Sequence, residues 1–595
     1  MTWQSWFVLA ATFATMLPAL IVIAKFAFRD VLLTGDIAII DARVRDIGQG
    51  SLPLVGPYSS QWSHPGPLFF YVLAPLHYLS GGAPWALIVG GVLLHLVAIG
   101  LAARLAWRRG GLILTLGVLA VLSLSTLGAT DRVLLDPWNP HVAMPFVVLF
   151  ILQLWSVTIG DRWQILGAAI VGSFLVQTHI GYAPIVAAGI AVVVVVVFID
   201  ARRSHTPART WSIPLVTAAG SAVVLWSTAI YEQSTGNPGN ISLIARYFGS
   251  SPEGQIGIRS GAGTFAALFR PLPVWLGGEQ RFQPLTFQPK PESLWWLVVP
   301  AGVLAIAAFV GIRRRLWDEV RLLVLVALLS GVGIVSLSRL KENAWSYMSL
   351  WRIPLAIIVV LASAWTLWSA WSRPPLFACR LAIATCCIAI LGGVIPVSRD
   401  ILSTDHVASG HTCASPIVSQ LRDQHPSGRV LVRSVAPALW GVTQAVIDDL
   451  DRRGVDVVVD EKLELLWGSS RVASVTQVDE VWIITEDGMR GALLEVSPGA
   501  QVLASTSPLA PAEDQELSKL QREVSQQLDN LGRPDLISWL DYSDFLPLLP
   551  EMIKAIDRNQ LDRISFLLSL ASESQSCRSS VVKFSPDDLP AALAE

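Results

Sequence analysis

The chain has 595 residues, of which 53% are hydrophobic and only 15% are charged, and its formal net charge is −2. A soluble protein typically carries roughly 25% charged residues, so this composition excludes a wholly soluble protein and indicates a polytopic membrane protein. The net charge by itself says nothing useful about nucleic acid, and we expect no nucleic-acid partner of a membrane protein of this kind. Arg supplies all but seven of the 43 basic residues. Together with abundant Ala, Val and Gly, this is typical of a GC-rich bacterial genome, such as that of an actinobacterium.

The first apolar run, 5–28, has neither a basic start nor a small-residue cleavage site. We therefore predict a retained transmembrane helix and not a signal peptide. Ten further runs also have the length and apolarity of spans. The eleven predicted spans are 5–28, 84–104, 111–129, 141–159, 165–181, 184–199, 212–231, 294–312, 320–337, 350–371 and 376–397.

The loops between these spans sort by charge. One alternate set is short and rich in Arg, which is typical of the cytoplasmic side. The other set is longer and more dilute in basic residues, so it should face outward; it comprises 29–64, 130–140, 232–293 and 338–349. We therefore predict a multi-pass protein of the bacterial plasma membrane, with a cytoplasmic N-terminus and an extracytoplasmic C-terminus.

Tryptophans near the predicted span ends fit the membrane interface, where amphipathic rings are favoured. They are Trp62, Trp138, Trp211, Trp295, Trp296, Trp345 and Trp351. This explains much of the high tryptophan content without a ligand.

Charged residues return after Ser398, so we divide the chain into a transmembrane domain, 1–397, and a soluble extracytoplasmic domain, 398–595. In the second domain, short β-branched runs alternate with amphipathic segments, which predicts an α/β fold. The predicted strands are 429–434, 455–460 and 481–485, with a helix at 436–454 and a mostly helical region at 513–572. Cys413 and Cys577 are its only cysteines. An oxidising compartment favours a disulfide between them, and two unpaired thiols are the alternative.

The first outer loop begins with "TGDIAIIDARVRDIGQG", residues 34–50. If 34–47 is helical, Asp36, Ile40 and Arg43 share one face, and Asp41 pairs with Arg45 four residues later. Charged groups at the bilayer interface are costly to desolvate and serve solvation or function. One interpretation is a functional helix; the other is a solvated amphipathic helix that lies on the membrane.

Further acids, histidines and cations follow in the other outer loops. They come from "HPGPLFFYVL" at 64–73, "TDRVLLDPWNPHV" at 130–142, "QTHIGYAP" at 177–184, "YEQSTGNPGNISLIARYF" at 231–248 and "SRLKENAWSYMSLWRIP" at 338–354. In the first of these, Gly66 lies between two prolines and predicts a sharp turn with His64 at its edge. The cytoplasmic loops contain little besides Arg, so the chemistry gathers on the outer side.

The order of these segments resembles that of the GT-C membrane glycosyltransferases, in particular the branch of protein O-mannosyltransferases and lipid A aminoarabinose transferases. The resemblance begins with Asp36, the helix that follows it, the "GSLPLVGPYS" turn and "HPGPLFFYVL". It continues with "LLDPWNP", which holds Asp136 and is similar to the second acidic site of the family. The stretch from Lys341 through Tyr347 and Arg352 to Pro354 is similar to a late family element. "HPGP" in place of "HPPL" indicates a distinct subfamily, which the composition suggests is actinobacterial.

The resemblance implies a polytopic α-helical, GT-C-like fold and a polyprenyl-phosphate sugar as donor. The donor would be delivered from the outer leaflet of the lipid bilayer, and the acceptor would be a cell-envelope glycan, a lipoglycan or a protein. Asp36 is then the general base and Asp136 the second catalytic acid. The predicted ligands of the donor phosphate are Arg246, Lys341 and Arg352. The predicted contacts to the acceptor or the sugar are His64, Asp41, Asn139 and Tyr347.

Each of these residues also has a purely structural interpretation. Asp136, just before a proline, would cap the fourth span. Lys341 and Arg352 would be cations that snorkel to the interface, and His64 and His179 would satisfy backbone groups. Asp36, Asp136 and His64 offer ligands to a divalent cation, Mg²⁺ or Mn²⁺, but their spacing is not diagnostic of a metal site, so metal use stays open.

Two other classes of function compete with a transferase. A transporter or flippase of lipid-linked sugars would place charges near the midplane on broken helices and show related halves. Here the charges gather at the outer ends of the spans and no repeat is visible. A membrane-anchored carbohydrate-binding or scaffold protein would make the first-loop acids dispensable. The sequence names neither the sugar, the acceptor nor the oligomeric state; arabinofuranose and mannose on decaprenyl phosphate suit an actinobacterial source.

Overall fold

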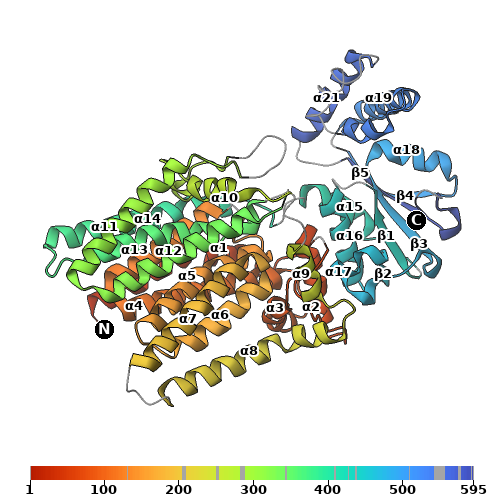
Figure 1. Ribbon diagram of the computed structural model, residues 1–595. Coiled ribbons are helices and arrows are strands. Elements are labelled where there is room, and N and C mark those ends of the chain that lie inside the picture. Colours follow the sequence, from red (N-terminus) through yellow and green to blue (C-terminus); the bar gives the residue numbers. More distant parts are fainter. Residues whose placement is uncertain are drawn as a thin grey trace. The chain divides into compact units, whose positions relative to one another are not determined.

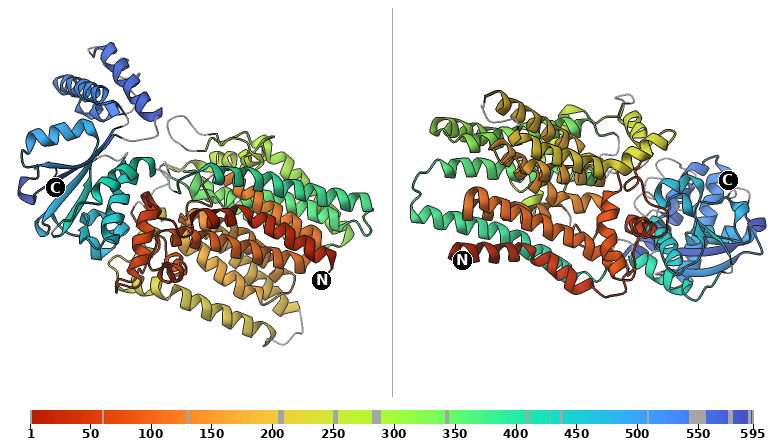
Figure 2. Two further views of the ribbon diagram at one scale, coloured as in Figure 1. Left: turned by 180° about the vertical axis from the view of Figure 1, so that it is seen from behind. Right: turned by 90° about the horizontal axis from the view of Figure 1, so that it is seen from below.

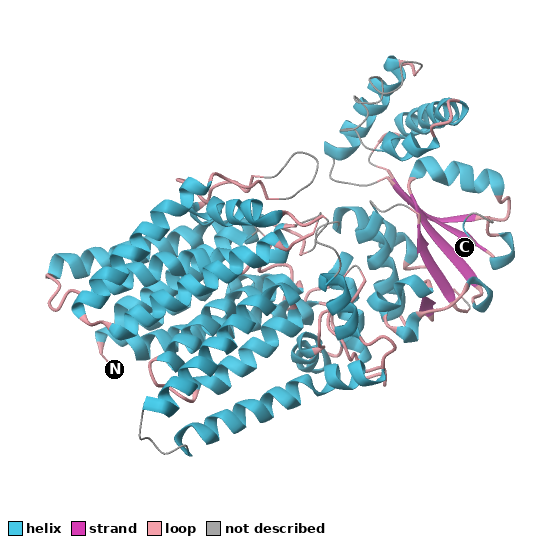
Figure 3. Ribbon diagram, viewed as in Figure 1, coloured by secondary structure: helices cyan, strands magenta, loops and turns pink. Residues whose placement is uncertain are grey.

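The computed structural model in Figure 1 divides the chain into two units. The membrane unit comprises Met1–Asp30 and Val44–Asp405, and the α/β unit comprises Val31–Arg43 and His406–Glu595. Helices make up most of the membrane unit, and the sheet belongs to the α/β unit (Figure 3). The structure describes residues 2–59, 61–129, 132–203, 209–249, 254–281, 289–341, 345–407, 411–426, 428–435, 439–507, 509–541, 556–573, 578–590 and 593.

The predicted polytopic helical architecture is confirmed. In the described part of the chain, nine helices are long and apolar enough to cross a bilayer. They are α1 (Trp3–Phe26), α4 (Trp85–Ala129), α5 (Asn139–Thr158), α7 (Ala183–Arg203), α8 (Arg209–Thr235), α11 (Val298–Arg314), α12 (Trp317–Ser338), α13 (Arg352–Ser369) and α14 (Leu376–Ser403). The shorter helices are α2 (Gly35–Asp46), α3 (Leu68–Leu79), α6 (Gln164–Thr178), α9 (Asn240–Gly249) and α10 (Gly257–Ala266).

Nine helices meet the criteria for a span where the sequence predicted eleven spans, and two helices explain the difference. Helix α4 has 45 residues and breaks at Gly110 and Gly111, where Gly111 has φ +60° and ψ −146°. Only glycine adopts this backbone conformation easily, so two of the predicted runs form the two halves of α4. Helix α6 covers a third run, but its 15 residues fall short of the roughly 20 that a span needs.

Helix α5 forms the centre of the membrane unit, because its side chains are buried on every face. It packs against both α4 and α6. On the other side of α4, helices α1 and α14 pack against it and against each other (Figure 2). Such all-round burial explains why α5 is apolar on every side and shows no amphipathic stripe.

Lys25 joins the ends of the first and last of these helices. Its Nζ donates to the carbonyl oxygens of Ile401 at 3.0 Å and Leu402 at 2.9 Å, and also to that of Thr404. These carbonyls belong to the last turn of α14 and its C-cap, where the helix dipole favours a cation. The contact ties α14 to the end of α1.

The α/β unit contains a mixed five-stranded sheet with the order β2-β1-β3-β5-β4. Strands β1 and β2 are parallel, as are β1 and β3, whereas β5 is antiparallel to both β3 and β4. The strands are β1 (Val430–Ser434), β2 (Val457–Val458), β3 (Glu480–Thr485), β4 (Gln501–Thr506) and β5 (Ser579–Phe584), and the main helices are α15 (His411–Leu421), α16 (Trp440–Arg452), α18 (Asp487–Val496), α19 (Pro511–Asn530) and α21 (Arg558–Glu573).

The predicted α/β fold of this unit is confirmed, but two strands were not predicted. The segments 429–434 and 455–460 contain β1 and β2, the segment 481–485 covers all of β3 except its first residue, and α16 lies within the predicted helix. Strand β5 comes from the tail of the chain, which reads as polar, and it enters the sheet beside β3. In β4 only one of six residues is fully buried, which explains the weakness of its pattern.

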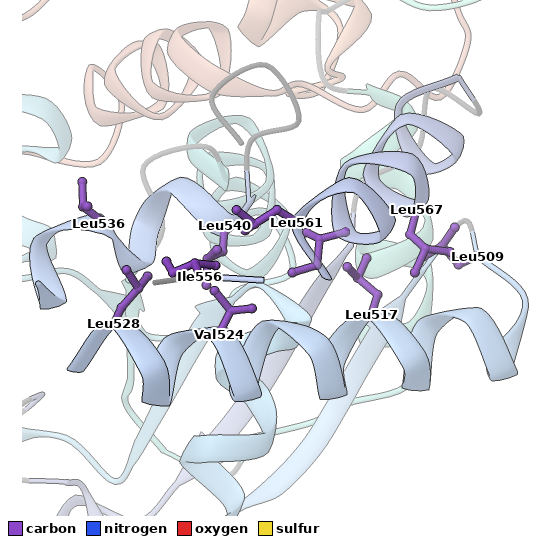
Figure 4. Packing of buried hydrophobic residues seen from close by; sticks show 10 residues of the cluster. Leu509, Leu517, Val524, Leu528, Leu536, Leu540, Ile556, Leu561 and Leu567 are labelled. Atoms are coloured by element: carbon purple, nitrogen blue, oxygen red, sulfur yellow. The ribbon is translucent and has the colours of Figure 1, made fainter. Parts of the chain in front are cut away.

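Helices α19 and α21 form a small helical layer with its own apolar core. Leu517, Val524 and Leu528 of α19 point toward Leu561 and Leu567 of α21 (Figure 4). All five side chains are almost completely buried. This layer agrees with the predicted helical region at 513–572, of which 542–555 lies outside the described residues.

Two predictions concern the start and the covalent closure of the second domain. Helix α14 runs to Ser403 and the units divide at Asp405, whereas the boundary was expected at 397. Cys413 is disulfide-bonded, as expected of an oxidising compartment. Its predicted partner, Cys577, lies outside the described residues.

Candidate functional site

The turn before α3 presents His64 and is fixed by buried polar contacts. Residues Tyr58 and Ser63 form an antiparallel bridge, so the chain folds back just before His64. Asn240, at the start of α9, accepts from the Ser63 N–H and donates to the Ser63 carbonyl oxygen, both at 2.8 Å. This pairing joins the loop before α3 to the start of α9. It was not predicted, because nothing in "GNPGN" distinguishes this asparagine from a turn residue.

The glycine of "HPGP" is required by close packing. A Cβ atom on Gly66 would lie 2.3 Å from Oε1 of Gln177. The Gln177 side chain has little room to give way, since it is completely buried and donates to the Leu225 carbonyl oxygen at 2.8 Å. The turn after His64 therefore tolerates a larger residue at this position only if the buried Gln177 side chain shifts.

His64 is buried and neutral. It is only 4% exposed, and its Nδ1 accepts from the N–H of Ile180 at 3.2 Å. The proton of the neutral ring therefore lies on Nε2. Its ring centroid lies 4.6 Å from that of His179. Burial, and secondarily the neighbouring His179, lower the pKa of His64 well below its usual value.

We expect this pair of histidines to make stability depend on pH. A histidine whose folded-state pKa is depressed stabilises the fold above its unfolded pKa of roughly 6.5, and this contribution is lost as pH falls below that value. At pH 5 the loss for His64 alone should be about 2 kcal/mol. Thermal unfolding in detergent at pH 7.5 and pH 5 measures it: the difference should shrink in His64→Gln and persist in a variant of the exposed His425. An equal pH dependence in all three proteins would contradict the prediction.

A row of rings leads from His64 to Asp136. The His179 ring centroid lies 6.4 Å from that of Tyr347, and the Tyr347 ring lies 4.5 Å from that of Trp138. Next to Trp138, at 5.3 Å, is the ring of His141, whose Nδ1 lies 4.0 Å from Oδ2 of Asp136. The structure therefore brings together segments that lie far apart in the sequence, and with them the predicted residues His64, Asp136 and Tyr347.

Asn139 and Trp62 belong to the same region but are buried. Asn139 donates from Nδ2 to the Thr178 carbonyl oxygen at 2.9 Å, at the end of α6. Trp62 is only 4% exposed and lies 5.5 Å from His64 and 5.8 Å from Tyr247, between ring centroids. The interpretation of Trp62 as an interface residue is therefore wrong: its ring packs inside the turn and supports His64.

The three predicted phosphate ligands differ in exposure. Lys341 Nζ donates to the Tyr247 carbonyl oxygen at 3.1 Å and lies 5.0 Å from the centroid of the Tyr247 ring. Arg246, the neighbour of that tyrosine in α9, is exposed. Lys341 thus contacts Tyr247, and the Tyr247 ring in turn lies next to Trp62 and so close to the row of aromatic rings. The Arg246 side chain is exposed instead.

Arg352 is a buried cation. It is 1% exposed, and its two terminal nitrogens donate to the Thr264 carbonyl oxygen and to Oε1 of Gln280, both at 3.3 Å. Its Nε has no hydrogen-bond partner among the described residues, and none of their carboxylates pairs with it. A guanidinium held in this way by neutral acceptors keeps its full charge available for an anion.

Two acids of the segment after α1, Asp36 and Asp41, belong to the α/β unit. Asp36 lies in the first turn of α2, and its Oδ1 accepts from the indole N–H of Trp440 at 3.2 Å. Asp41 is completely buried, and its Oδ2 lies 2.5 Å from Nη2 of Arg452. Arg452 Nε also donates to Asp448 at 3.2 Å. Asp41 therefore has a structural partner, and its predicted contact with the acceptor or the sugar stays a prediction.

No group of three or more His, Cys, Asp or Glu side chains suited to a metal ion occurs within the ranges that the structure describes. A divalent cation at Asp36, Asp136 or His64 thus stays a prediction that no cluster of ligands supports.

No protein-family model and no curated protein matches this sequence. Solved structures do match: ArnT from Cupriavidus metallidurans bound to undecaprenyl phosphate has a TM-score of 0.51 at 14% identity, over 84% of this chain and 97% of that chain. The fold resembles that of ArnT. The apo form of the same protein gives 0.50 at 15% identity, over 84% and 96%. The Archaeoglobus fulgidus oligosaccharyltransferase, in complex with Zn and sulfate, gives 0.40 at 9% identity, over 80% and 68%.

The match to ArnT extends beyond the membrane unit. That unit holds about two thirds of the chain, whereas the matched share is 84%. The similarity therefore includes part of the α/β unit. Over its full length it is a similarity of fold.

Proposed function

We propose that this protein is a GT-C glycosyltransferase that moves a sugar from a polyprenyl-phosphate donor to an extracytoplasmic acceptor. The observation that carries the proposal is the ArnT-like fold, which covers 97% of a chain whose structure contains undecaprenyl phosphate. The residue pattern of the outer loops supports it independently. The acceptor in this proposal is a cell-envelope glycan, a lipoglycan or a protein.

The proposal includes a topology. Eleven spans, with the two halves of α4 and the short α6 each crossing the bilayer, give a cytoplasmic N-terminus and an extracytoplasmic C-terminus. Both Arg108 and Arg109 lie beside the glycine break of α4, which then falls on the cytoplasmic side. His64, Asp136 and Lys341 then lie at the outer surface, where a lipid-linked donor presents its sugar. The source in this proposal is an actinobacterium.

The reaction needs a base and positive charge. Asp36 takes the proton of the acceptor hydroxyl, whose oxygen attacks the anomeric carbon. The bond between that carbon and the phosphate oxygen breaks, and the polyprenyl phosphate leaves with the bonding electrons. Attack from the face opposite the phosphate inverts the anomeric centre. Asp136, partly exposed and with its Oδ2 4.0 Å from Nδ1 of His141, orients the sugar or the acceptor.

Arg352, Lys341 and Arg246 stabilise the charge on the departing phosphate. Among them Arg352 carries the strongest structural argument. A buried charge without a counter-ion is expensive, and a phosphate would supply the negative charge that the described surroundings of Arg352 lack. Lys341, already in contact with Tyr247, would act as a point charge.

We expect Arg352→Met to weaken donor use. A hydrogen bond to a charged group contributes about 1.5–3 kcal/mol, so the apparent KM for the donor should rise roughly 10- to 100-fold. Arg352→Lys keeps the charge but loses the planar guanidinium, so its KM for the donor should lie between those of wild type and Arg352→Met. Titration of the donor against transfer rate measures the effect. A donor KM that is unchanged in Arg352→Met would remove Arg352 from the phosphate site.

The proposal is tested with purified full-length protein in lipid nanodiscs. A panel of radiolabelled polyprenyl-phosphate sugars is added, and binding and slow hydrolysis are recorded for wild type and Asp36→Asn. Binding of one donor, with turnover lost in the variant, supports the transferase and identifies the sugar. If no donor binds, the transferase is excluded in favour of a scaffold; binding with movement of the donor across the bilayer but no cleavage favours a flippase.

A further inference from the structure

Most of helix α2, residues 35–43, belongs to the α/β unit, although in the sequence almost the whole membrane unit lies between it and the rest of that unit. Residues Val31–Arg43 group with His406–Glu595. The contact is close: a Cβ atom on Gly35, the first residue of α2, would lie 3.9 Å from the Trp440 ring. Gly35 has φ +56°, a backbone conformation that starts the helix beside the indole and that glycine adopts easily.

Among the described residues, two polar contacts join this part of α2 to opposite ends of α16. Trp440, the first residue of α16, donates to Asp36 at 3.2 Å. Arg452, the last residue of α16, pairs with the buried Asp41 at 2.5 Å. Two contacts that lie a whole helix apart restrain both the position of α2 and its rotation about its own axis. The direction in which the Asp36 carboxylate points is therefore set by α16.

An indole can act on a carboxylate in one way only. Its N–H is a hydrogen-bond donor, and the ring has no group that accepts or transfers a proton near neutral pH. Trp440 therefore takes no part in proton transfer. A donor aimed at one carboxylate oxygen selects the rotamer in which the other oxygen faces away from the ring.

We infer that Trp440 is a positioning residue for Asp36, and that one role of the α/β unit is to hold α2 so that this carboxylate faces the acceptor. The inference rests on the proposed role of Asp36 as general base. It assigns to the second unit a part in the reaction that requires no carbohydrate-binding surface there.

The test combines two measurements on the full-length protein in nanodiscs. Hydrogen exchange, read by mass spectrometry, reports protection of the backbone amides of α2 and needs no substrate. Transfer kinetics with the donor identified from the polyprenyl-phosphate sugar panel report kcat and KM. The variants are Trp440→Phe, which removes the N–H, and Asp36→Asn, whose amide oxygen still accepts from Trp440. The control is Trp295→Phe, since Trp295 is 76% exposed at the start of α11.

In Trp440→Phe we expect faster exchange in α2 and a kcat that is roughly 10- to 100-fold lower, with the donor KM unchanged. In Asp36→Asn we expect protection close to that of wild type but no turnover, which separates the hold on α2 from the chemistry. Trp295→Phe should match wild type in both measurements. If Trp440→Phe does not fold, Trp440→His, which keeps a ring N–H, replaces it and should retain more turnover than Trp440→Leu.

Two results would overturn the inference: exchange in α2 that is the same in Trp440→Phe and wild type, or faster exchange with an unchanged kcat. Failure of the proposed function looks different. Wild-type protein that turns over no donor removes the catalytic role of Asp36, while the exchange data still decide whether Trp440 holds α2.

Discussion

Asp36→Asn should lower the rate of sugar transfer by orders of magnitude in a protein that remains folded. The amide has nearly the shape of the carboxylate and keeps an oxygen that can accept from Trp440, so α2 should stay in place. It cannot take the proton of the acceptor hydroxyl. General-base catalysis contributes about 10²- to 10⁴-fold, and the transfer rate at saturating donor should fall by that factor, measured with the radiolabelled donor.

The matched control is Asp423→Asn, because Asp423 is an exposed acid of the same unit. Its transfer rate should equal that of wild type. Donor binding should survive in both variants, since neither removes a cation. A rate in Asp36→Asn within a few-fold of wild type would exclude Asp36 as the base, and Asp136→Asn would then be the next variant to measure.

Arg452→Met should cause the largest loss of stability among single substitutions in the α/β unit. Asp41 is completely buried, and Arg452 serves both Asp41 and the buried Asp448. Removing one partner of a buried pair leaves charge without compensation and costs about 3–5 kcal/mol. We expect a decrease of this size in the free energy of unfolding, followed by denaturant titration of the protein in detergent.

An exposed ion pair of the same unit provides the comparison. Arg429 and Asp456 lie 2.8 Å apart, with their side chains 44% and 58% exposed. Exposed pairs contribute about 0–1 kcal/mol, so Arg429→Met should have a small effect. The double variant Arg452→Met with Asp41→Asn should regain part of the loss, because it no longer buries the Asp41 charge. Equal effects of Arg452→Met and Arg429→Met would contradict a buried pair that anchors α2.

The sequence predicted the membrane helices well because apolarity and length determine them directly. It predicted that the segments around His64, Asp136 and Tyr347 lie on one side of the membrane. In the structure a row of rings connects them, from His64 through Trp138, and their roles stay predictions. In the sequence the glycine break in α4 was visible only as a gap between two apolar runs, because an apolar pattern does not reveal the backbone dihedral angles of a glycine.

Contacts between residues that lie far apart in the sequence could not be predicted from it. Asp36 and Trp440 are 404 positions apart, and neither has a motif that names the other. The predicted local partner of Asp41 was Arg45, at helical spacing; its pairing with Arg452, from another helix, was not predicted. Trp62 likewise lies in the sequence near a predicted span, as an interface residue would, but its side chain is buried. In each case the local sequence pattern allowed several environments for the side chain, and tertiary packing decided between them.

The grouping of α2 with the last part of the chain has a consequence for biosynthesis. Asp36 leaves the ribosome early, but Trp440 follows 404 residues later, and at about 5–20 residues per second this delay is roughly 20 to 80 seconds. During that interval the membrane helices are inserted while α2 still lacks its partner. Chains that stop after the last span would therefore carry every membrane helix but hold the proposed base loosely, so that activity would begin only when the final domain has been synthesised and has folded.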